Sequence, residues 1–195
     1  PCTPVTTLDV ECFGGIPRAE KMTWLRKWML LQGVDQVLLS SLDEIAWMLN
    51  VRGSDIEYNP LVISFLLVSQ DSVRWFVKKT MTDDPDTLDS FSELEADGVK
   101  IEDYDALSYS LSDEGPDVRI FIDPSTLNYH IYSNIKDNFA PDHIVEGTSP
   151  VILEKSVKSP SEIENLRQTY IEDGVAMERF LHWLETEGAS GREGT

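Results

Sequence analysis

The stretch LDEIAWMLNVRGSDIEYNPLVISFLLV, residues 42–68, contains the patterns that decide the fold. Its start places Ile45, Trp47 and Met48 close enough together for the apolar face of a short helix. Its end, LVISFLLV, is a continuous apolar run of strand length, which is typical of a strand buried on both faces. Between them lies a polar segment with an Arg-Gly pair and an Asn-Pro pair. We therefore expect a helix, a specific loop and a buried strand in that order.

The start of this helix carries a capping signal. Ser41 and Glu44 have the S-x-x-E spacing of a capping box, in which each side chain accepts a hydrogen bond from the other residue's main-chain N–H. We expect this box to fix the first turn of the helix.

Helices and short strands alternate on both sides of this stretch. Before it, Met22, Leu25 and Met29 fall at helical spacing, Gly33 is placed to end that helix, and VDQVLLSS suits a buried strand. After it, Gln70-Asp71-Ser72 separates two strand-like runs and suits a hairpin turn. Further helices are expected at 88–96, 105–111 and 125–135, strands at 99–104 and 118–123, and an extended segment at 143–160.

This alternation predicts an α/β domain with a central sheet flanked by helices, and the hairpin makes that sheet mixed rather than wholly parallel. The last predicted element is a long helix. Ser159 and Glu162 form a second capping box around Pro160, which occupies the favoured first helical position. An apolar stripe then runs along this helix from Ile163 to Leu184.

Composition restricts the possible partners. The 195 residues include 16 Lys and Arg but 35 Asp and Glu, so the formal net charge is −19. A surface of this sign repels phosphates, which argues against nucleic-acid binding, and the simplest interpretation of the charge is solubility. No apolar run reaches the length of a membrane helix, so no membrane partner is expected.

The two cysteines and the N-terminus indicate the context of the chain. Cys2 and Cys12 are too few for a disulfide scaffold, and we expect two free thiols in a reducing compartment. The start has neither a basic region nor an apolar signal core. A chain that begins with Pro1 in a proline- and threonine-rich stretch looks like a piece cut from a longer protein.

The sequence contains no convincing self-contained active site. The three histidines are His130, His143 and His182, and none forms a metal-binding pair. The run DDPD at 83–86 lacks the ligand spacing of a calcium loop and suits a solvated turn. The acidic pairs 43–44 and 172–173 both have structural explanations, a helix start and a solvated helix face. We therefore assign no catalytic residue and no metal ligand to this chain.

The opening stretch nevertheless carries a specific motif, D-E-x-x-W-x-x-N-x-R-G-x-D followed by N-P. Its members here are Asp43, Glu44, Trp47, Asn50, Arg52, Gly53, Asp55, Asn59 and Pro60. This motif closely resembles the middle domain of the three-domain aminopeptidase P (Xaa-Pro aminopeptidase) of the creatinase/prolidase "pita-bread" metallopeptidase family. Residues 158–185 resemble the helix that opens the catalytic domain of that family, a pattern shared more widely.

The resemblance implies a division into three parts. Residues 1–15 would be an interdomain segment, residues 16–150 a creatinase N-terminal-like middle domain, and residues 151–195 the linker and first helix of a truncated catalytic domain. The partners would then be the missing N-terminal and catalytic domains of the same chain.

The resemblance also implies the chemistry of the parent enzyme. That enzyme would be a cytoplasmic hydrolase that removes the N-terminal residue preceding proline from peptides, and it could form a homodimer. It would use two divalent metals, usually manganese, to activate a bridging water. The family's metal ligands all lie downstream of residue 195, so the fragment alone is expected to lack the metal site and to be inactive.

Two interpretations of the motif remain open. In the functional one, Trp47, Asn50, Arg52, Asp55 and Tyr58 face the catalytic domain or the substrate, and Arg52 offers a planar fork to a carboxylate. In the structural one, Gly53 allows a tight backbone, Arg52 pairs with an acid such as Asp55, and Trp47 packs in the core. Two other functions are also possible for the chain: a peptide- or protein-binding module from a metal-free relative of the peptidases, and a spacer between domains.

Overall fold

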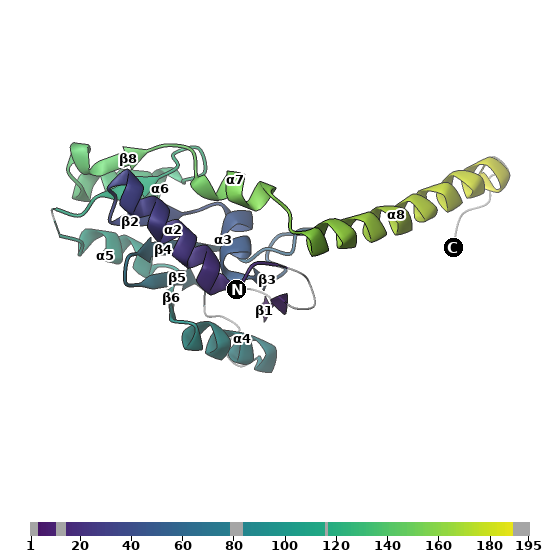
Figure 1. Ribbon diagram of the computed structural model, residues 1–195, viewed down its shortest axis with the longest axis horizontal. Coiled ribbons are helices and arrows are strands. Elements are labelled where there is room, and N and C mark those ends of the chain that lie inside the picture. The colour runs from purple at the N-terminus through teal and green to yellow at the C-terminus, as the bar shows by residue number, and fades with distance from the viewer. Residues whose placement is uncertain (1–3, 11–14, 79–83, 116, 189–195) are drawn as a thin grey trace. The chain divides into compact units, whose positions relative to one another are not determined.

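The structure is a computed structural model that describes residues 4–10, 15–78, 84–115 and 117–188 (Figure 1). The chain divides into two compact units. Among the described residues, the first unit combines residues 4–10 with those between 16 and 157, and the second combines residue 15 with residues 158–188. Cys2 and Cys12 lie outside the described residues, as does Asp83 of the DDPD run.

A six-stranded sheet forms the centre of the first unit, in the order β6-β5-β4-β2-β7-β8. β2 pairs antiparallel with β4, and β4 with β5, whereas the other neighbours are parallel. The mixed sheet expected from the sequence is therefore confirmed. Its strands are β2 (Gln36–Leu39), β4 (Ser64–Ser69), β5 (Val73–Val77), β6 (Val99–Asp103), β7 (Ile120–Ile122) and β8 (Ile144–Glu146).

Helices flank the sheet on both faces (Figure 1). On β4, Leu66 and Val68 belong to one apolar cluster, while Phe65 and Leu67 belong to a second cluster on the opposite face. The first cluster includes residues of α2, α3, α4 and α7, and the second includes residues of α5 and α6. This double coverage explains why β4 is an uninterrupted apolar run, since each fully buried side chain of this size contributes roughly 1.5–3 kcal/mol.

The helices begin and end close to the expected positions. Gly33 ends α2 with a φ of 64°, a left-handed conformation that glycine adopts without steric cost. The helices of the first unit are α2 (Arg18–Gln32), α3 (Leu42–Leu49), α4 (Pro85–Ala96), α5 (Ala106–Ser112), α6 (Tyr129–Asn138) and α7 (Pro150–Ser156).

Two expected boundaries differ from the structure. α4 begins at Pro85, earlier than expected, because Asp84 caps it by accepting a hydrogen bond from the Thr87 main-chain N–H at 2.9 Å. The expectation of an extended segment at 143–160 is wrong. β8 is followed there by the helix α7, because Pro150 occupies the first helical position directly after the Ser149 cap.

The capping box predicted at the start of α3 is also wrong. The Ser41 hydroxyl donates to the Asp43 carboxylate at 2.6 Å, and Ser41 makes no side-chain cap. Glu44 is 2% exposed, and its carboxylate accepts a hydrogen bond from the Ser149 hydroxyl at the head of α7. Asp43 forms an ion pair with Lys155 of α7. The contact between Glu44 and Ser149 has thus replaced the expected local contact with Ser41. Burial raises the pKa of the Glu44 carboxyl.

The segment before α2 packs onto this unit. β1 (Thr6–Thr7) pairs antiparallel with β3 (Val51–Arg52), and Val5 is fully buried. The Val5 main-chain N–H donates to the Thr87 hydroxyl of α4 at 3.0 Å. Residues 5–7 therefore join β3 to α4.

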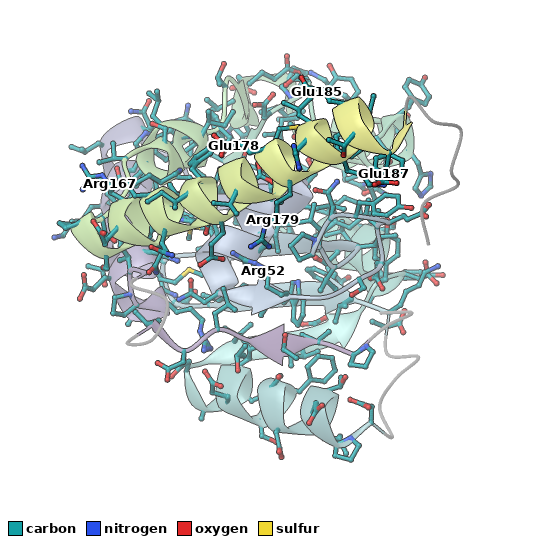
Figure 2. All side chains as sticks on the ribbon, turned by 90° about the vertical axis from the view of Figure 1, so that its right-hand side faces the viewer. Arg52, Arg167, Glu178, Arg179, Glu185 and Glu187 are labelled. Atoms are coloured by element: carbon teal, nitrogen blue, oxygen red, sulfur yellow. The ribbon has the colours of Figure 1, made fainter. Side chains whose placement is uncertain are left out.

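The second unit consists mainly of α8 (Pro160–Thr186), a helix of 27 residues. The predicted capping box at its start is confirmed, since both hydrogen bonds between Ser159 and Glu162 are present. Its charged side chains include Arg167, Glu178 and Arg179, which Figure 2 labels along the helix. None of the described helices, α8 included, is long and apolar enough to cross a membrane.

An ion pair between two neighbouring strands predicts how stability depends on pH. Arg74 of β5 donates through two nitrogens to both carboxylate oxygens of Glu102 of β6, at 2.8 and 3.0 Å. The hydrogen bonds from Arg74 lower the pKa of Glu102 to about 2. The charged form therefore stabilises the fold above the unfolded pKa of 4.5, and this contribution is lost as the pH falls towards 2.

We expect Glu102→Gln to lower the free energy of unfolding at neutral pH and to flatten its decline between pH 4.5 and 2. Urea titrations across that range measure both effects. Glu95→Gln, which removes an exposed carboxylate of α4, serves as the control for net charge. Identical pH profiles for Glu102→Gln and the wild type would contradict the prediction.

Candidate functional site

The motif segment, residues 47–61, runs from the end of α3 through β3 and returns by a loop towards β4. It leads into the start of β4, which runs antiparallel to β2 with Leu66 opposite Leu39, so its end lies at the carboxyl end of a central strand. In open α/β sheets, ligand sites form at such ends. The five residues singled out from the sequence occupy different positions within it.

Asn50 is the structural pivot of the segment. It ends α3 with a φ of 53°, a left-handed conformation that asparagine tolerates better than most residues, and it is 7% exposed. Its side-chain oxygen accepts from the Lys21 ammonium at 2.6 Å, and its amide nitrogen donates to the Ile16 carbonyl at 3.0 Å. Its own carbonyl accepts from the Leu8 N–H at 2.8 Å. Asn50 thus joins three segments that are distant in sequence.

Lys21 is a participant that the sequence analysis missed. It is 2% exposed, and its ammonium donates to the Trp47 carbonyl and lies 4.3 Å from the centre of the Trp47 ring. The position of Lys21 along α2 could have identified it from the sequence. Lys21 precedes Leu25 by four residues and adjoins Met22, so it lies on the apolar face of the helix. Trp47 in turn packs partly buried against the first core cluster.

Arg52 is half-buried and does not form the expected ion pair with Asp55 (Figure 2 labels Arg52). One terminal nitrogen donates to the carbonyls of Ala46 at 3.2 Å and Val51 at 2.8 Å. The Asp55 carboxylate instead accepts from the Ile63 N–H at 2.9 Å. The structural interpretation is wrong on this pair, because the hydrogen bonds described for each side chain go to main-chain groups instead.

The chemistry of Arg52 is that of a cation held in place with donors to spare. Burial lowers its pKa, but a guanidinium remains charged at neutral pH. A guanidinium has five N–H donors, and only one of its three nitrogens is used in the hydrogen bonds described above. Among the described residues no carboxylate forms an ion pair with Arg52. The Arg52 guanidinium can therefore donate hydrogen bonds to a carboxylate from outside this unit.

Tyr58 lies at the tip of a loop closed by main-chain hydrogen bonds, from Gly53 to Pro60 at 3.4 Å and from Asp55 to Leu61 at 3.1 Å. Its φ is 62° and its side chain is 95% exposed. A left-handed conformation costs a non-glycine residue roughly 1–2 kcal/mol, and strain of this kind is frequent at binding sites. The loop thus holds an aromatic ring almost entirely in solvent.

The five predicted residues therefore divide into two groups. Trp47 and Asn50 meet at Lys21, and Asp55 closes the base of the loop, so these three have clear structural roles. Arg52 keeps N–H donors and Tyr58 keeps an exposed ring, and the hydrogen bonds described above use neither. The prediction that they face a catalytic domain or a substrate is not tested by these contacts and stays a prediction.

No metal centre is found within residues 4–10, 15–78, 84–115 and 117–188, where no three histidine, cysteine or acidic side chains could together hold an ion. The ring nitrogen Nε2 of His130 lies 3.4 Å from the Ser108 hydroxyl. The described residues therefore do not fit a two-metal site.

Comparison with known proteins assigns the family. The profile of the Creatinase/Prolidase N-terminal domain matches residues 1–162. The chain belongs to that family. Its members include the pita-bread peptidases that the motif resembles.

Relatives of known activity match nearly the whole chain. Xaa-Pro aminopeptidase 2 of Homo sapiens is 37% identical over 98% of the chain, and Xaa-Pro aminopeptidase 1 of Dictyostelium discoideum is 32% identical over 90%. The chain spans only 28% and 26% of these two proteins. The solved X-prolyl aminopeptidase of Caenorhabditis elegans, described as a cytosolic enzyme with a di-nuclear active site, superposes with a TM-score of 0.82. It is 31% identical, and the match covers 97% of this chain and 30% of that one.

The role of Asn50 in this creatinase/prolidase domain gives a stability prediction. Asn50→Ala removes both side-chain hydrogen bonds and puts a strained residue at positive φ, so we expect a loss of about 3 kcal/mol in the free energy of unfolding. Asn50→Gly relieves the strain and should cost less, and Asn50→Asp should retain most of the stability. Chemical denaturation measures all three. Equal stability of Asn50→Ala and the wild type would contradict this role.

Proposed function

We propose that this chain is a non-catalytic part of a metal-dependent Xaa-Pro aminopeptidase that removes the N-terminal residue preceding proline from peptides. The observation that carries the proposal is the match of nearly the whole chain to Xaa-Pro aminopeptidases three to four times its length. Residues 16–150 are the middle domain, residues 1–15 precede it as an interdomain segment, and residues 151–195 lead into the catalytic domain. The whole protein acts in the cytoplasm.

In the whole protein the chemistry resides outside this chain. A two-metal site supplies an activated water and polarises the scissile carbonyl. The described residues offer no donor set for such ions, so we assign no step to them. We infer that the two metals, which we take to be manganese, bind in the catalytic domain and that this chain alone is inactive.

The contribution of this domain is a wall of the active site. Arg52 carries it, because its guanidinium is fixed by two carbonyls and keeps donors for a carboxylate on the substrate or on the catalytic domain. Tyr58 adds an exposed ring at the loop tip that can cover an apolar group of the peptide. Trp47, Asn50 and Asp55 hold the segment in shape.

We expect Arg52→Ala in the full-length enzyme to reduce kcat/KM for a proline-containing peptide by about tenfold to a hundredfold, the value of a hydrogen bond to a charged group. The free energy of unfolding should fall by about 1–3 kcal/mol, since the carbonyls of Ala46 and Val51 lose a donor, so kcat/KM is measured on the folded protein. Arg52→Lys should recover part of the activity. Lys27→Ala removes an exposed cation of α2 and serves as the control. A loss of stability with normal turnover by the folded fraction would instead leave Arg52 a structural role.

The assignment of the metals to another domain gives a separate test. Calorimetric titration of this chain with manganese should show no tight stoichiometric site, and the purified chain should leave an Arg-Pro-Pro peptide intact. The full-length protein, measured in parallel, provides the positive control. The assignment is contradicted if the isolated chain binds manganese tightly. It is also contradicted if the chain cleaves the Arg-Pro-Pro peptide with contaminating protease excluded.

A further inference from the structure

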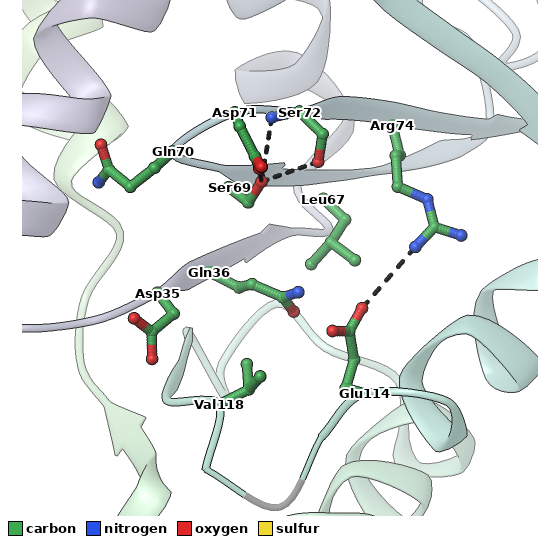
Figure 3. A pocket seen from close by; sticks show the side chains of 10 residues that line it. All are labelled: Asp35, Gln36, Leu67, Ser69, Gln70, Asp71, Ser72, Arg74, Glu114 and Val118. Atoms are coloured by element: carbon green, nitrogen blue, oxygen red, sulfur yellow. Dashed lines mark hydrogen bonds and ion pairs between the residues drawn. The ribbon is translucent and has the colours of Figure 1, made fainter.

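A second polar site lies at the opposite end of β2 from the motif segment. Gln36 begins β2, whereas Leu39 ends it and leads into α3. Around Gln36 is a cleft of about 450 Å³ that no part of the proposed peptidase function uses (Figure 3). Its wall combines the first residues of β2, the β4–β5 turn and the loop after α5. The lining residues are Asp35, Gln36, Leu67, Ser69, Gln70, Asp71, Ser72, Arg74, Glu114 and Val118.

Gln36 is the unusual member of this wall. It is 8% exposed, and its side-chain oxygen is buried with no hydrogen-bond donor among the described residues. Figure 3 shows its amide end pointing towards Leu67 and Glu114, inside the cleft. A buried carbonyl oxygen without a donor is destabilising and rare in folded proteins. Since Leu38, on the same face of β2, is apolar, an aliphatic residue would fit position 36 better. The amide therefore points to a ligand that donates to it.

The charges of the cleft indicate what kind of donor fits. Asp35, Asp71 and Glu114 contribute three carboxylates, and Arg74 is the one cation of the lining. Arg74 is already engaged. Glu102 accepts hydrogen bonds from two of its nitrogens, and one of these nitrogens also donates to the Ser110 hydroxyl. Its remaining nitrogen lies 3.8 Å from Glu114, which is beyond normal hydrogen-bond length. The cleft is thus rich in negative charge and in acceptors.

The carboxylates of Asp35 and Asp71 can also accept further hydrogen bonds. One oxygen of Asp35 accepts from the Arg119 main-chain N–H at 2.8 Å, and one oxygen of Asp71 accepts from the Ser69 hydroxyl at 2.7 Å. A carboxylate offers about four lone-pair positions, so each can accept again. Asp35 and Asp71 are exposed to solvent, and Glu114 forms an ion pair with Arg74 at 3.8 Å. A cation with several N–H donors is the ligand class that can donate both to these carboxylates and to Gln36.

We propose that this cleft binds a guanidinium group, carried either by a small molecule or by an arginine side chain of a peptide. The amide oxygen of Gln36 accepts one N–H from inside the cleft. Glu114 accepts from the opposite wall and supplies the compensating charge. Leu67 and Val118 contact the aliphatic part of the ligand.

Binding is tested on the whole 195-residue chain with three probes. Butylguanidinium represents a free small cation, the peptide acetyl-Gly-Arg-Gly-amide represents a side chain, and the same peptide with citrulline replaces the cation with a neutral group of nearly equal shape. Methyl NMR signals of Leu67 and Val118 report on the cleft, and those of Leu153, an exposed residue of α7, report on non-specific effects. We expect saturable shifts at Leu67 and Val118 with one or both cations, and the tighter cation identifies the source.

Two variants from different elements make the test specific. Gln36→Met and Glu114→Gln should each weaken binding by about tenfold, as expected for the loss of a charge-assisted hydrogen bond. Gln36→Met should also raise the Tm, since it removes the unpartnered oxygen. Gln32→Met, at an exposed position of α2, is the matched control and should change neither property.

The proposal is overturned if neither cation gives a saturable shift, if the citrulline peptide binds as tightly as the arginine peptide, or if both variants bind like the wild type. The peptidase activity of the full-length protein is not a readout of this test. A failure here therefore leaves the proposed function untouched.

Discussion

The first unit depends on the placement of one buried ammonium group. Lys21 extends from α2 under the ring of Trp47 and donates to the Trp47 carbonyl and the Asn50 side chain. Burying an ammonium is costly unless hydrogen bonds replace its water. Asn50 can supply one of these bonds only because its left-handed backbone ends α3 at this point. The same residue then holds the N-terminal segment through Leu8 and Ile16, so the helix end, β3 and the chain entry are fixed together.

Periodicity in the sequence was sufficient to predict the central sheet and most helices. β2 and β4 were recognisable because both faces are covered, which makes them apolar without alternation, and Gly33 marked the end of α2. The predictions failed where a distant partner competed with a local one. Glu44 had the right spacing for a capping box but bonds Ser149, more than a hundred residues away. A run of β-branched residues suggested an extended segment where Ser149 and Pro150 begin α7.

The candidate site was predictable in position but not in its contacts. The motif identified the segment, and three of the five predicted site residues, Trp47, Asn50 and Asp55, make contacts that shape it. Side-chain type alone does not reveal those contacts. Arg52 and Asp55 have complementary charges, yet each side chain forms hydrogen bonds with main-chain groups rather than an ion pair with the other. Lys21 and Gln36 were detectable as polar residues in apolar patterns. Their partners, or the lack of one, depend on packing that no short stretch of sequence contains.

The strand order has a consequence for how the chain reaches this structure. β2 lies between β4 and β7, and its pairing with β7 joins Gln36 to Ile120 across 84 positions. Contacts between residues so far apart in the sequence form late, because closing the long loop between the two strands costs entropy. Until then the side of β2 that faces away from β4 is an unpaired apolar edge, open to pairing with another molecule. During synthesis, the interval before residues 120–122 emerge is thus when this domain is most exposed to aggregation.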